Sequence, residues 1–200
     1  MTKLNAYIVE KAKAFVLKIL SDELPEECVF HSPEHTLDVY NYALVVGRES
    51  GFSENELNCL GVSALFHDIG YTVSHDEHEI ISVAKATEFL SSMDVNKDDI
   101  EQVKRAILAT KVPQKPEDRV SEALCDADLL HLALNDYFER MEKLRLEWKL
   151  SGRLDLTEQE FHENSIKFFG QHHYHTKYGR QILAPKKDIT LSRIIEKVKK

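Results

Sequence analysis

Hydrophobic positions along the chain recur at the spacing of amphipathic helices. In the first such segment Leu4, Ile8, Phe15 and Ile19 fall near helical intervals, with lysines between them. Comparable patterns occupy residues 33–49, 53–67, 80–90, 100–108, 121–134, 137–149, 158–169 and 191–199. Because apolar residues three and four positions apart share one helix face, the pattern predicts an all-α chain. No strand-rich block, internal repeat or low-complexity linker interrupts it.

Capping residues sharpen the start of two of these helices. Ser32 can cap the helix end at residue 33, where Pro33 suits the first position and Glu34 favours the helix dipole. Gly51 ends that helix, and Ser53-Glu54-Asn55-Glu56 then forms a capping box. These signals predict helices that begin near residues 33 and 54.

Composition and charge mainly exclude classes of protein. A chain of 200 residues with 7 Gly and 5 Pro suits one helical domain, which we expect to span residues 1–200. The formal charge of -8 argues against tight binding to nucleic-acid backbones. The sequence contains no uncharged apolar stretch long enough to predict a membrane segment, and we expect a cytoplasmic protein. The sequence leaves the oligomeric state open. The three cysteines lack CxxC spacing and are interpreted as reduced core thiols.

Two His-Asp pairs stand out as candidate metal ligands, and their settings differ. His67 and Asp68 follow the apolar run Ser63-Ala64-Leu65-Phe66, where polar side chains would be partly buried and would need partners. His75 and Asp76 lie in a polar turn, where exposure explains them. The first pair is therefore the better candidate.

Two further segments carry donors that could converge with this pair. His35 lies in the first turn of its helix, and Asp126-Ala127-Asp128 lies within an apolar run. Each segment alone is better explained by polar residues at helix ends and caps. Acidic side chains beside a hydrophobic face are costly unless they are paired or coordinated, and helical bundles build metal sites from such inward-pointing donors. Their joint occurrence favours a metal centre.

The order of these residues resembles the H…HD…D signature of the HD superfamily. The segments that carry the resemblance are Phe30-His31-Ser32-Pro33-Glu34-His35-Thr36, Leu65-Phe66-His67-Asp68-Ile69-Gly70 and Cys125-Asp126-Ala127-Asp128-Leu129. They define a motif-bearing core at about residues 30–135. The resemblance implies a single-domain helical bundle of the HD type. It also implies a divalent metal held by His35, His67, Asp68 and Asp128, and hydrolysis of phosphate esters, often in nucleotides.

Two more segments, Ile107-Leu108-Ala109-Thr110-Lys111 and His172-His173-Tyr174-His175-Thr176, resemble a bacterial subgroup of predicted HD phosphohydrolases. The chain lacks the paired histidines and GYP segment of the cyclic-dinucleotide phosphodiesterases. It also has Gly70-Tyr71-Thr72 where the guanosine tetraphosphate hydrolases look for an acidic pair. The ester therefore stays open, with a small phosphorylated substrate expected and a nucleotide favoured.

The predicted chemistry is hydrolysis by a metal-activated water. A divalent ion held by imidazoles and carboxylates lowers the pKa of a bound water and polarises a phosphoryl oxygen, whether it is Mn, Mg, Fe, Co, Ni or Zn. We place Asp68 and Lys111 among the catalytic residues, with Lys111 neutralising charge on the phosphate. Asp126 points away from Asp128 on a helix and is expected to orient a neighbour or cap a backbone group.

Several alternatives remain open from the sequence. One bound ion is expected, and His78 and Glu79 are the best donors for a second. His172, in the histidine cluster near the end of the chain, is left outside the site. The main rival function is a catalytically silent HD-type module that binds a nucleotide or a protein partner. A helical metal oxygenase is a weaker alternative, because it would need more histidine ligands.

Overall fold

The computed structural model describes residues 1–199, in which helices are joined by loops and turns; Lys200 lies outside the described residues. Its α-helices are α1 (Ala6–Glu23), α2 (Pro33–Glu49), α3 (Glu54–Phe66), α4 (His78–Ser92), α5 (Lys97–Ala109), α6 (Arg119–Asp128), α7 (Tyr137–Leu150), α8 (Glu158–Gln171) and α9 (Ala184–Val198). Three short helical segments also occur: the 3-10 helices η1 (Ile69–Thr72) and η2 (Leu129–Ala133), and the π-helix η3 (Gly179–Leu183). Within residues 1–199 no strand forms, so the all-α prediction is confirmed.

The helix starts follow the capping signals in the sequence. The side chain of Ser32 accepts a hydrogen bond from the backbone of His35, and Pro33 occupies the first turn of α2. Both halves of the Ser53 and Glu56 capping box form at α3. These caps satisfy N–H groups that would otherwise lack partners at a helix end, and so fix where His35 lies.

Two predicted helix bounds are wrong. The segment expected as one helix over 121–134 ends as an α-helix at Asp128 and continues as the tighter η2. The ring of His131 lies 3.0 Å from the Asp128 carbonyl, and this bond favours the tighter winding. The last helix begins at Ala184 rather than 191, because Pro185 is tolerated in its first turn.

Helix α3 lies at the centre of the first group of helices, α1 to α6. Every residue from Cys59 to Phe66 is buried, so this helix is enclosed on all sides. It packs against α1, α2, α5 and α6, and the helix α4 packs against α5. His67 and Asp68 follow directly after α3, and the core therefore carries them into the interior.

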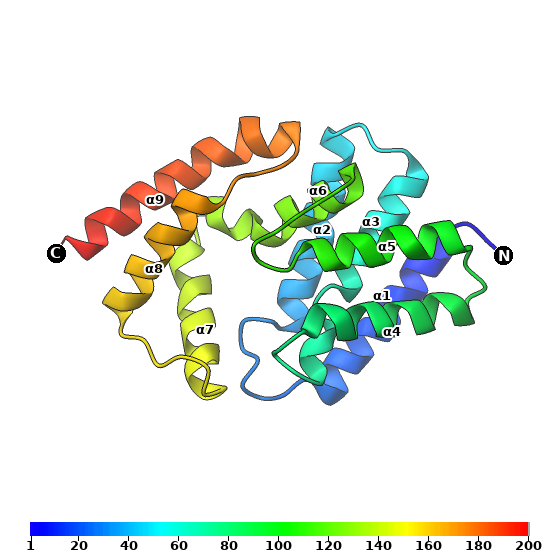
Figure 1. Ribbon diagram of the computed structural model, residues 1–200, viewed down its shortest axis with the longest axis horizontal. Helices are drawn as coiled ribbons and strands as arrows, with labels where there is room; N and C mark the ends of the chain where they lie inside the picture. The colour runs from blue at the N-terminus through cyan, green and yellow to red at the C-terminus, as the bar shows by residue number, and fades with distance from the viewer. Residues whose placement is uncertain (200) are drawn as a thin grey trace.

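The last three helices form a second group beside the first. Figure 1 shows α7, α8 and α9 on the left, α1 to α5 on the right, and α6 near the middle. A separate hydrophobic cluster fills the second group, and it includes Tyr137, Phe161, Phe169 and Ile194. The two termini lie at opposite ends of the molecule (Figure 1).

Two buried carboxylates join the two groups. Asp126 on α6 accepts hydrogen bonds from the backbone N–H groups of His175 and Thr176, at 2.7 and 2.9 Å. Glu147 on α7 accepts from the backbone N–H groups of Phe30 and His31, at 2.8 and 3.0 Å. Each group thus supplies a carboxylate that binds backbone of the other.

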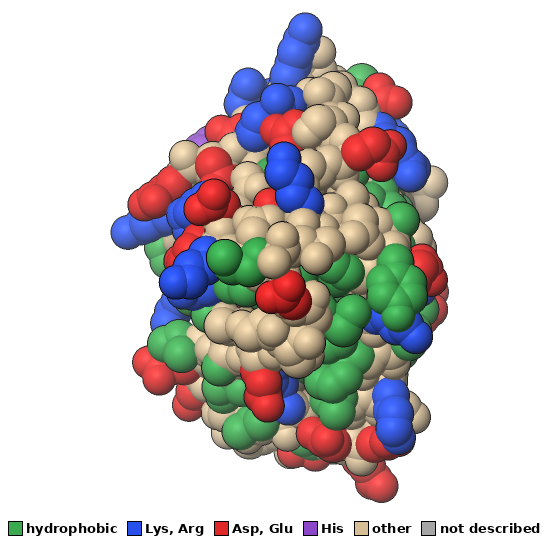
Figure 2. All heavy atoms as spheres, turned by 90° about the vertical axis from the view of Figure 1, so that its right-hand side faces the viewer, with side chains coloured by type: hydrophobic (Ala, Val, Ile, Leu, Met, Phe, Trp, Pro, Cys, Tyr) green, Lys and Arg blue, Asp and Glu red, His purple; other side chains and the backbone are tan. Residues whose placement is uncertain are grey.

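The surface at the N-terminal end is mixed in charge. Figure 2 shows acidic and basic side chains interspersed there, with hydrophobic side chains in small groups between them. Among the described residues, no helix is both long and apolar enough to cross a membrane.

Candidate metal centre

Two buried histidines point one nitrogen each into the same place. His67 is 1% exposed, and its Nδ1 lies 2.8 Å from the Ala64 carbonyl. Because a carbonyl only accepts, Nδ1 carries a proton, and Nε2 is the nitrogen that is left to bind a metal when it is not protonated. His35, in the first turn of α2, is 5% exposed. Its Nε2 faces the same carboxylates as the Nε2 of His67.

Two carboxylates complete this cluster from different helices. Asp68 is buried, and its Oδ2 lies 3.0 Å from His67 Nε2 and 3.4 Å from His35 Nε2. Asp128, at the end of α6, is partly exposed, and its Oδ1 lies 3.6 and 3.7 Å from the same two nitrogens. The structure therefore brings together all four predicted ligands.

The cluster fits a divalent ion. The donor atoms of His35, His67 and Asp128 all lie within 4.8 Å of one another. Both Nε2 atoms are buried, and among the described residues neither makes a well-directed hydrogen bond to the carboxylates beside it. Buried nitrogens without partners are costly, and an ion that accepts their lone pairs would remove that cost.

The histidines and aspartates of the cluster shift one another's pKa values. Burial alone would lower the pKa of His67, but the carboxylates of Asp68 and Asp128 outweigh it and raise that pKa well above its usual value. Burial likewise opposes ionisation of Asp68, but His67 and His35 hold its pKa well below the usual range. The carboxylates thus stay ionised beside imidazoles that take up protons. A divalent cation would replace those protons.

Asp126 has the separate position expected for it. It is fully buried, and besides the two backbone bonds it accepts a hydrogen bond from Thr176 Oγ1 at 2.7 Å. The backbone N–H of Gly179 donates in turn to that hydroxyl, at 2.8 Å. Asp126 therefore caps backbone groups of the following segment, as the sequence analysis predicted, and lies outside the cluster.

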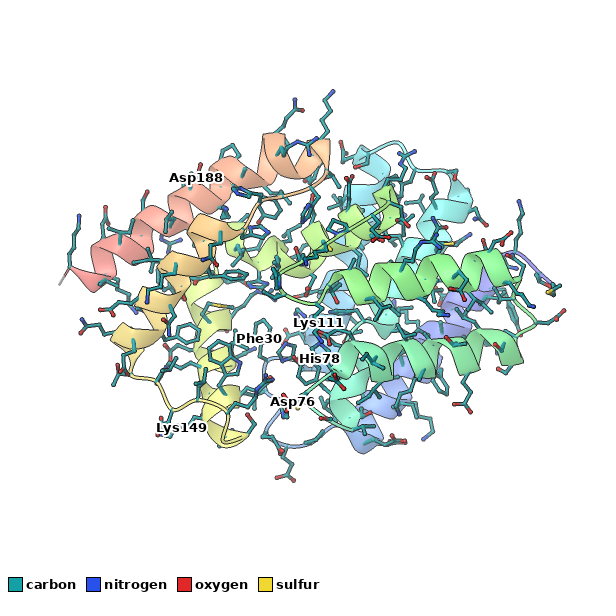
Figure 3. The ribbon with its side chains drawn as sticks, viewed as in Figure 1. Phe30, Asp76, His78, Lys111, Lys149 and Asp188 are labelled. Atoms are coloured by element: carbon teal, nitrogen blue, oxygen red, sulfur yellow. The ribbon has the colours of Figure 1, made fainter. Side chains whose placement is uncertain are left out.

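Other predicted residues lie around the cluster. His78 Nε2 is 3.6 Å from Asp68 Oδ1 and 3.6 Å from Glu79 Oε1, so the candidates for a second ion do adjoin the centre. Lys111 is exposed and lines the same cavity as Asp68 and Asp128. Lys111 and His78 both line this cavity, and Figure 3 shows them where the two helix groups meet.

The remaining histidines of interest have other surroundings. His75 packs edge-on against Tyr71, with ring centroids 5.3 Å apart. His172 is buried between the rings of Phe168 and Tyr174. Burial lowers the pKa of His172 to about 3, which fits a neutral side chain in a packed interior.

The sequence analysis gave no role to three side chains: Tyr71 and His31, which line the cavity, and Glu147, which contacts His31. The ring of Tyr71 is stacked between His31, at 4.0 Å, and His78, at 4.2 Å. The carboxylate of Glu147 also pairs with Nδ1 of His31. His31 stands four residues before His35, which is the only local signal for it. No pattern in the charged helix around Glu147 indicates that this residue is buried.

A cavity of about 830 Å³ opens from the cluster toward the second helix group. Asp68, Asp128 and Lys111 line one part of it, while Trp148 and Phe168 line another. A space of this volume holds a small organic molecule. The cluster can therefore be reached by a ligand that also contacts α7 and α8.

Comparison with known proteins agrees with this geometry. Residues 34–133 match the model of the HD domain. The structure resembles that of Bacillus subtilis YpgQ in complex with ADP, with a TM-score of 0.68, 18% identity, and coverage of 100% of this chain and 96% of that chain. It also resembles a Lactobacillus plantarum protein, with a TM-score of 0.69, 15% identity, and coverage of 96% of both chains.

At these identities the two structures show a shared fold. No curated protein matches the sequence. The domain match covers half of the chain, including His35, His67, Asp68 and Asp128. The chain therefore belongs to the HD domain family.

Proposed function

We propose that this protein is a metal-dependent phosphohydrolase that acts on a nucleotide or another small phosphate ester. HD domain proteins are generally metal-dependent hydrolases. The observation that carries the proposal is the cluster of His35, His67, Asp68 and Asp128, with its two unpartnered nitrogens, at one end of a cavity. The structure of YpgQ with ADP supports a nucleotide as the substrate class.

The residues of the chain have distinct roles in this proposal. His35, His67, Asp68 and Asp128 would hold the ion. When bound, the ion would supply a Lewis acid and lower the pKa of a water molecule. Lys111, at the same cavity, would bind the phosphate oxygens and reduce the charge that develops on them. The cavity walls would limit the access of bulk water and hold the rest of the substrate.

The stack of His31, Tyr71 and His78 gives the wall beside Asp68 a fixed shape. The ring centroid of Tyr71 lies 4.0 Å from that of His31 and 4.2 Å from that of His78. Glu147, on α7, holds His31 in place through its Nδ1. Such a rigid wall orients a bound ester relative to the cluster.

A metal analysis combined with a substrate screen tests the proposal. The purified protein is analysed for bound metal, stripped with a chelator and reloaded with Mn²⁺, Mg²⁺, Fe²⁺, Co²⁺, Ni²⁺ or Zn²⁺. Release of phosphate or pyrophosphate is then measured with nucleoside mono-, di- and triphosphates and with sugar phosphates. We expect hydrolysis that requires metal. A protein that holds metal and hydrolyses none of these compounds would instead be a silent binding module.

A further inference from the structure

The two histidines of the metal cluster differ in what their second ring nitrogen contacts. Nδ1 of His67 lies 2.8 Å from the Ala64 carbonyl, so a backbone group orients that ring. Nδ1 of His35 has no hydrogen-bond partner among the described residues, and its backbone N–H is capped by Ser32. When Nε2 of His35 binds an ion, Nδ1 carries the proton of the ring and needs an acceptor.

The position of this nitrogen differs from that of Nε2 in the same ring. The fully buried nitrogens without partners include Nε2 of His35 but not Nδ1, so Nδ1 faces accessible space. A small cavity of about 60 Å³ lies against His35, whereas Asp68 and Asp128 line the large one. His35 therefore meets accessible space at the small cavity.

The small cavity lies where the start of α2 meets the start of α7. Figure 3 shows Phe30, which lines it, between the two helix groups. The ring of Phe30 lies 4.9 Å from the ring of His35 and forms the apolar part of the wall. The polar part of the wall is formed by Ser32, Glu34, Asp136, Glu139, Arg140 and Lys143.

The size and the lining of this cavity suit water. One water molecule needs at least about 10–15 Å³ of such space, so a few fit. Hydroxyl, carboxylate, guanidinium and ammonium groups around the cavity can each bond to water. A water molecule with several polar partners is held in a fixed position. Such a water can accept the hydrogen bond that Nδ1 of His35 donates.

Glu139 differs from the other acidic side chains at the small cavity. Glu34 pairs with Lys143 at 3.6 Å, and Asp136 pairs with Arg140 at 2.9 Å. Glu139, in the first turn of α7, has no ion pair or hydrogen bond of its side chain within residues 1–199. An ionised carboxylate only accepts, and a water that accepts from a histidine can donate to it.

We propose that the small cavity holds an ordered water that accepts a hydrogen bond from Nδ1 of His35 and donates one to Glu139. The water and the carboxylate fix the orientation of the ring and keep the proton on Nδ1, which leaves Nε2 to the ion. Glu139 is then a positioning residue. The second helix group thus takes part in metal binding, although the four ligands come from the first, whether or not the bound ion hydrolyses an ester.

The metal affinity of the full-length protein tests this role. The protein is stripped of metal, and Zn²⁺ is then titrated in competition with a chelator of known affinity. Glu139→Ala should weaken Zn²⁺ binding about 10-fold, the lower end of the effect of an outer partner of a metal ligand. Glu139→Asp keeps a carboxylate that water can bridge, and it should restore most of the affinity.

Two controls separate positioning from the loss of one negative charge. Glu34→Ala removes the same charge from the same cavity, where Lys143 pairs with it. Glu142→Ala removes it from the next turn of α7, where Glu142 pairs with Arg145. Both should bind Zn²⁺ as the parent does. Urea unfolding is measured for each variant, because a carboxylate in a first helical turn also stabilises the helix. A loss of stability in Glu139→Ala without a loss of affinity would assign Glu139 to that role alone.

The Nδ1 proton of His35 gives a spectroscopic readout. In Zn²⁺-loaded protein labelled with ¹⁵N-histidine, the Nδ1 proton of His67 is the internal reference, because the Ala64 carbonyl binds it in every variant. The proton of His35 should exchange slowly with solvent in the parent and in Glu139→Asp, and faster in Glu139→Ala.

Three results would each overturn the inference: unchanged Zn²⁺ affinity in Glu139→Ala, an equal loss of affinity in either control, or equal exchange of the His35 proton in all variants. A protected His35 proton in a Zn²⁺-loaded protein that hydrolyses no ester would instead remove the proposed function and leave the inference standing.

Discussion

The two helix groups fill their interiors with different side chains. Around α3 the buried residues are mostly aliphatic or small, as with Leu60, Ala64 and Leu65, and they are completely excluded from solvent. Of the eight buried residues in the second cluster, Phe30, Tyr137, Phe161 and Phe169 are aromatic. Aliphatic side chains pack without gaps and so hold the metal ligands in fixed positions. The second group instead leaves a cavity along its aromatic walls.

This comparison separates two tasks. In the proposed function, the first group would hold the ion and the phosphate, and the second group would contact the rest of the ligand. The predictions that follow test whether changes in one group leave the task of the other unaltered.

Removing a ligand from the first group should have the largest effect. His67→Ala or Asp68→Ala leaves the cluster under-coordinated, and we expect loss of bound metal with a fall in activity of more than about 100-fold. Elemental analysis and turnover measured on the same samples check this. His75→Ala is the control and should retain both. Metal retained by His67→Ala but lost from His75→Ala would identify the other His-Asp pair as the centre.

The next largest effect is expected on stability, at the contact of Asp126 with the segment that follows α8. Asp126→Asn should lower the free energy of unfolding by about 1–3 kcal/mol, because an amide cannot accept all of the hydrogen bonds from His175 and Thr176. Its metal affinity should change little. Urea unfolding and metal titration measure the two quantities.

Asp128→Asn is the matched variant, since it changes the same kind of side chain two residues away. It should lose metal affinity while keeping most of its stability. A larger loss of metal affinity in Asp126→Asn than in Asp128→Asn would contradict the assignment of Asp128 as the ligand.

A smaller effect is expected at Lys111. Lys111→Ala should lower turnover about 10-fold to 100-fold without loss of metal, because the cation would contact the phosphate rather than the ion. Lys115→Ala, in the same loop, is the control. Metal content and steady-state rates of both variants decide the matter. If the rate of Lys111→Ala matches that of Lys115→Ala, or if His78→Ala loses one of two bound ions, the role given to Lys111 is wrong.

The fold and the ligand cluster were predictable because their signals are local. Periodic apolar residues and the caps at Ser32 and Ser53 determine where helices begin, and His67 follows an uninterrupted apolar run. Such signals depend on neighbours within one or two helical turns. The family resemblance then distinguished Asp128 from Asp126, which residue spacing alone did not.

The cavity walls were not predictable because their signals are long-range. Glu147 is separated by 116 residues from His31, and its surroundings read as an ordinary charged helix. Tyr71 is stacked between two histidines that come from different segments. The contact of Glu147 joins the two helix groups, and the stack of Tyr71 joins separate segments of the first group. Periodicity within one helix carries no information about either set of partners.

The smallest effect concerns His172, in the second group, and depends on pH. Burial lowers its pKa to about 3 in the folded protein, against about 6.5 in an unfolded chain. Between these values the unfolded state binds more protons, so stability should fall as the pH drops below about 6.5, by at most about 1.4 kcal/mol per pH unit from this group.

His172→Phe removes the titrating ring and should flatten the profile of unfolding free energy between pH 6.5 and pH 4, whereas His173→Phe, at an exposed position, should not. Metal content at neutral pH should be the same in both variants, because His172 packs against Phe168 and Tyr174 and not against the cluster. Parallel profiles for His172→Phe and the parent would show that the burial of this ring does not set the acid sensitivity of the second group.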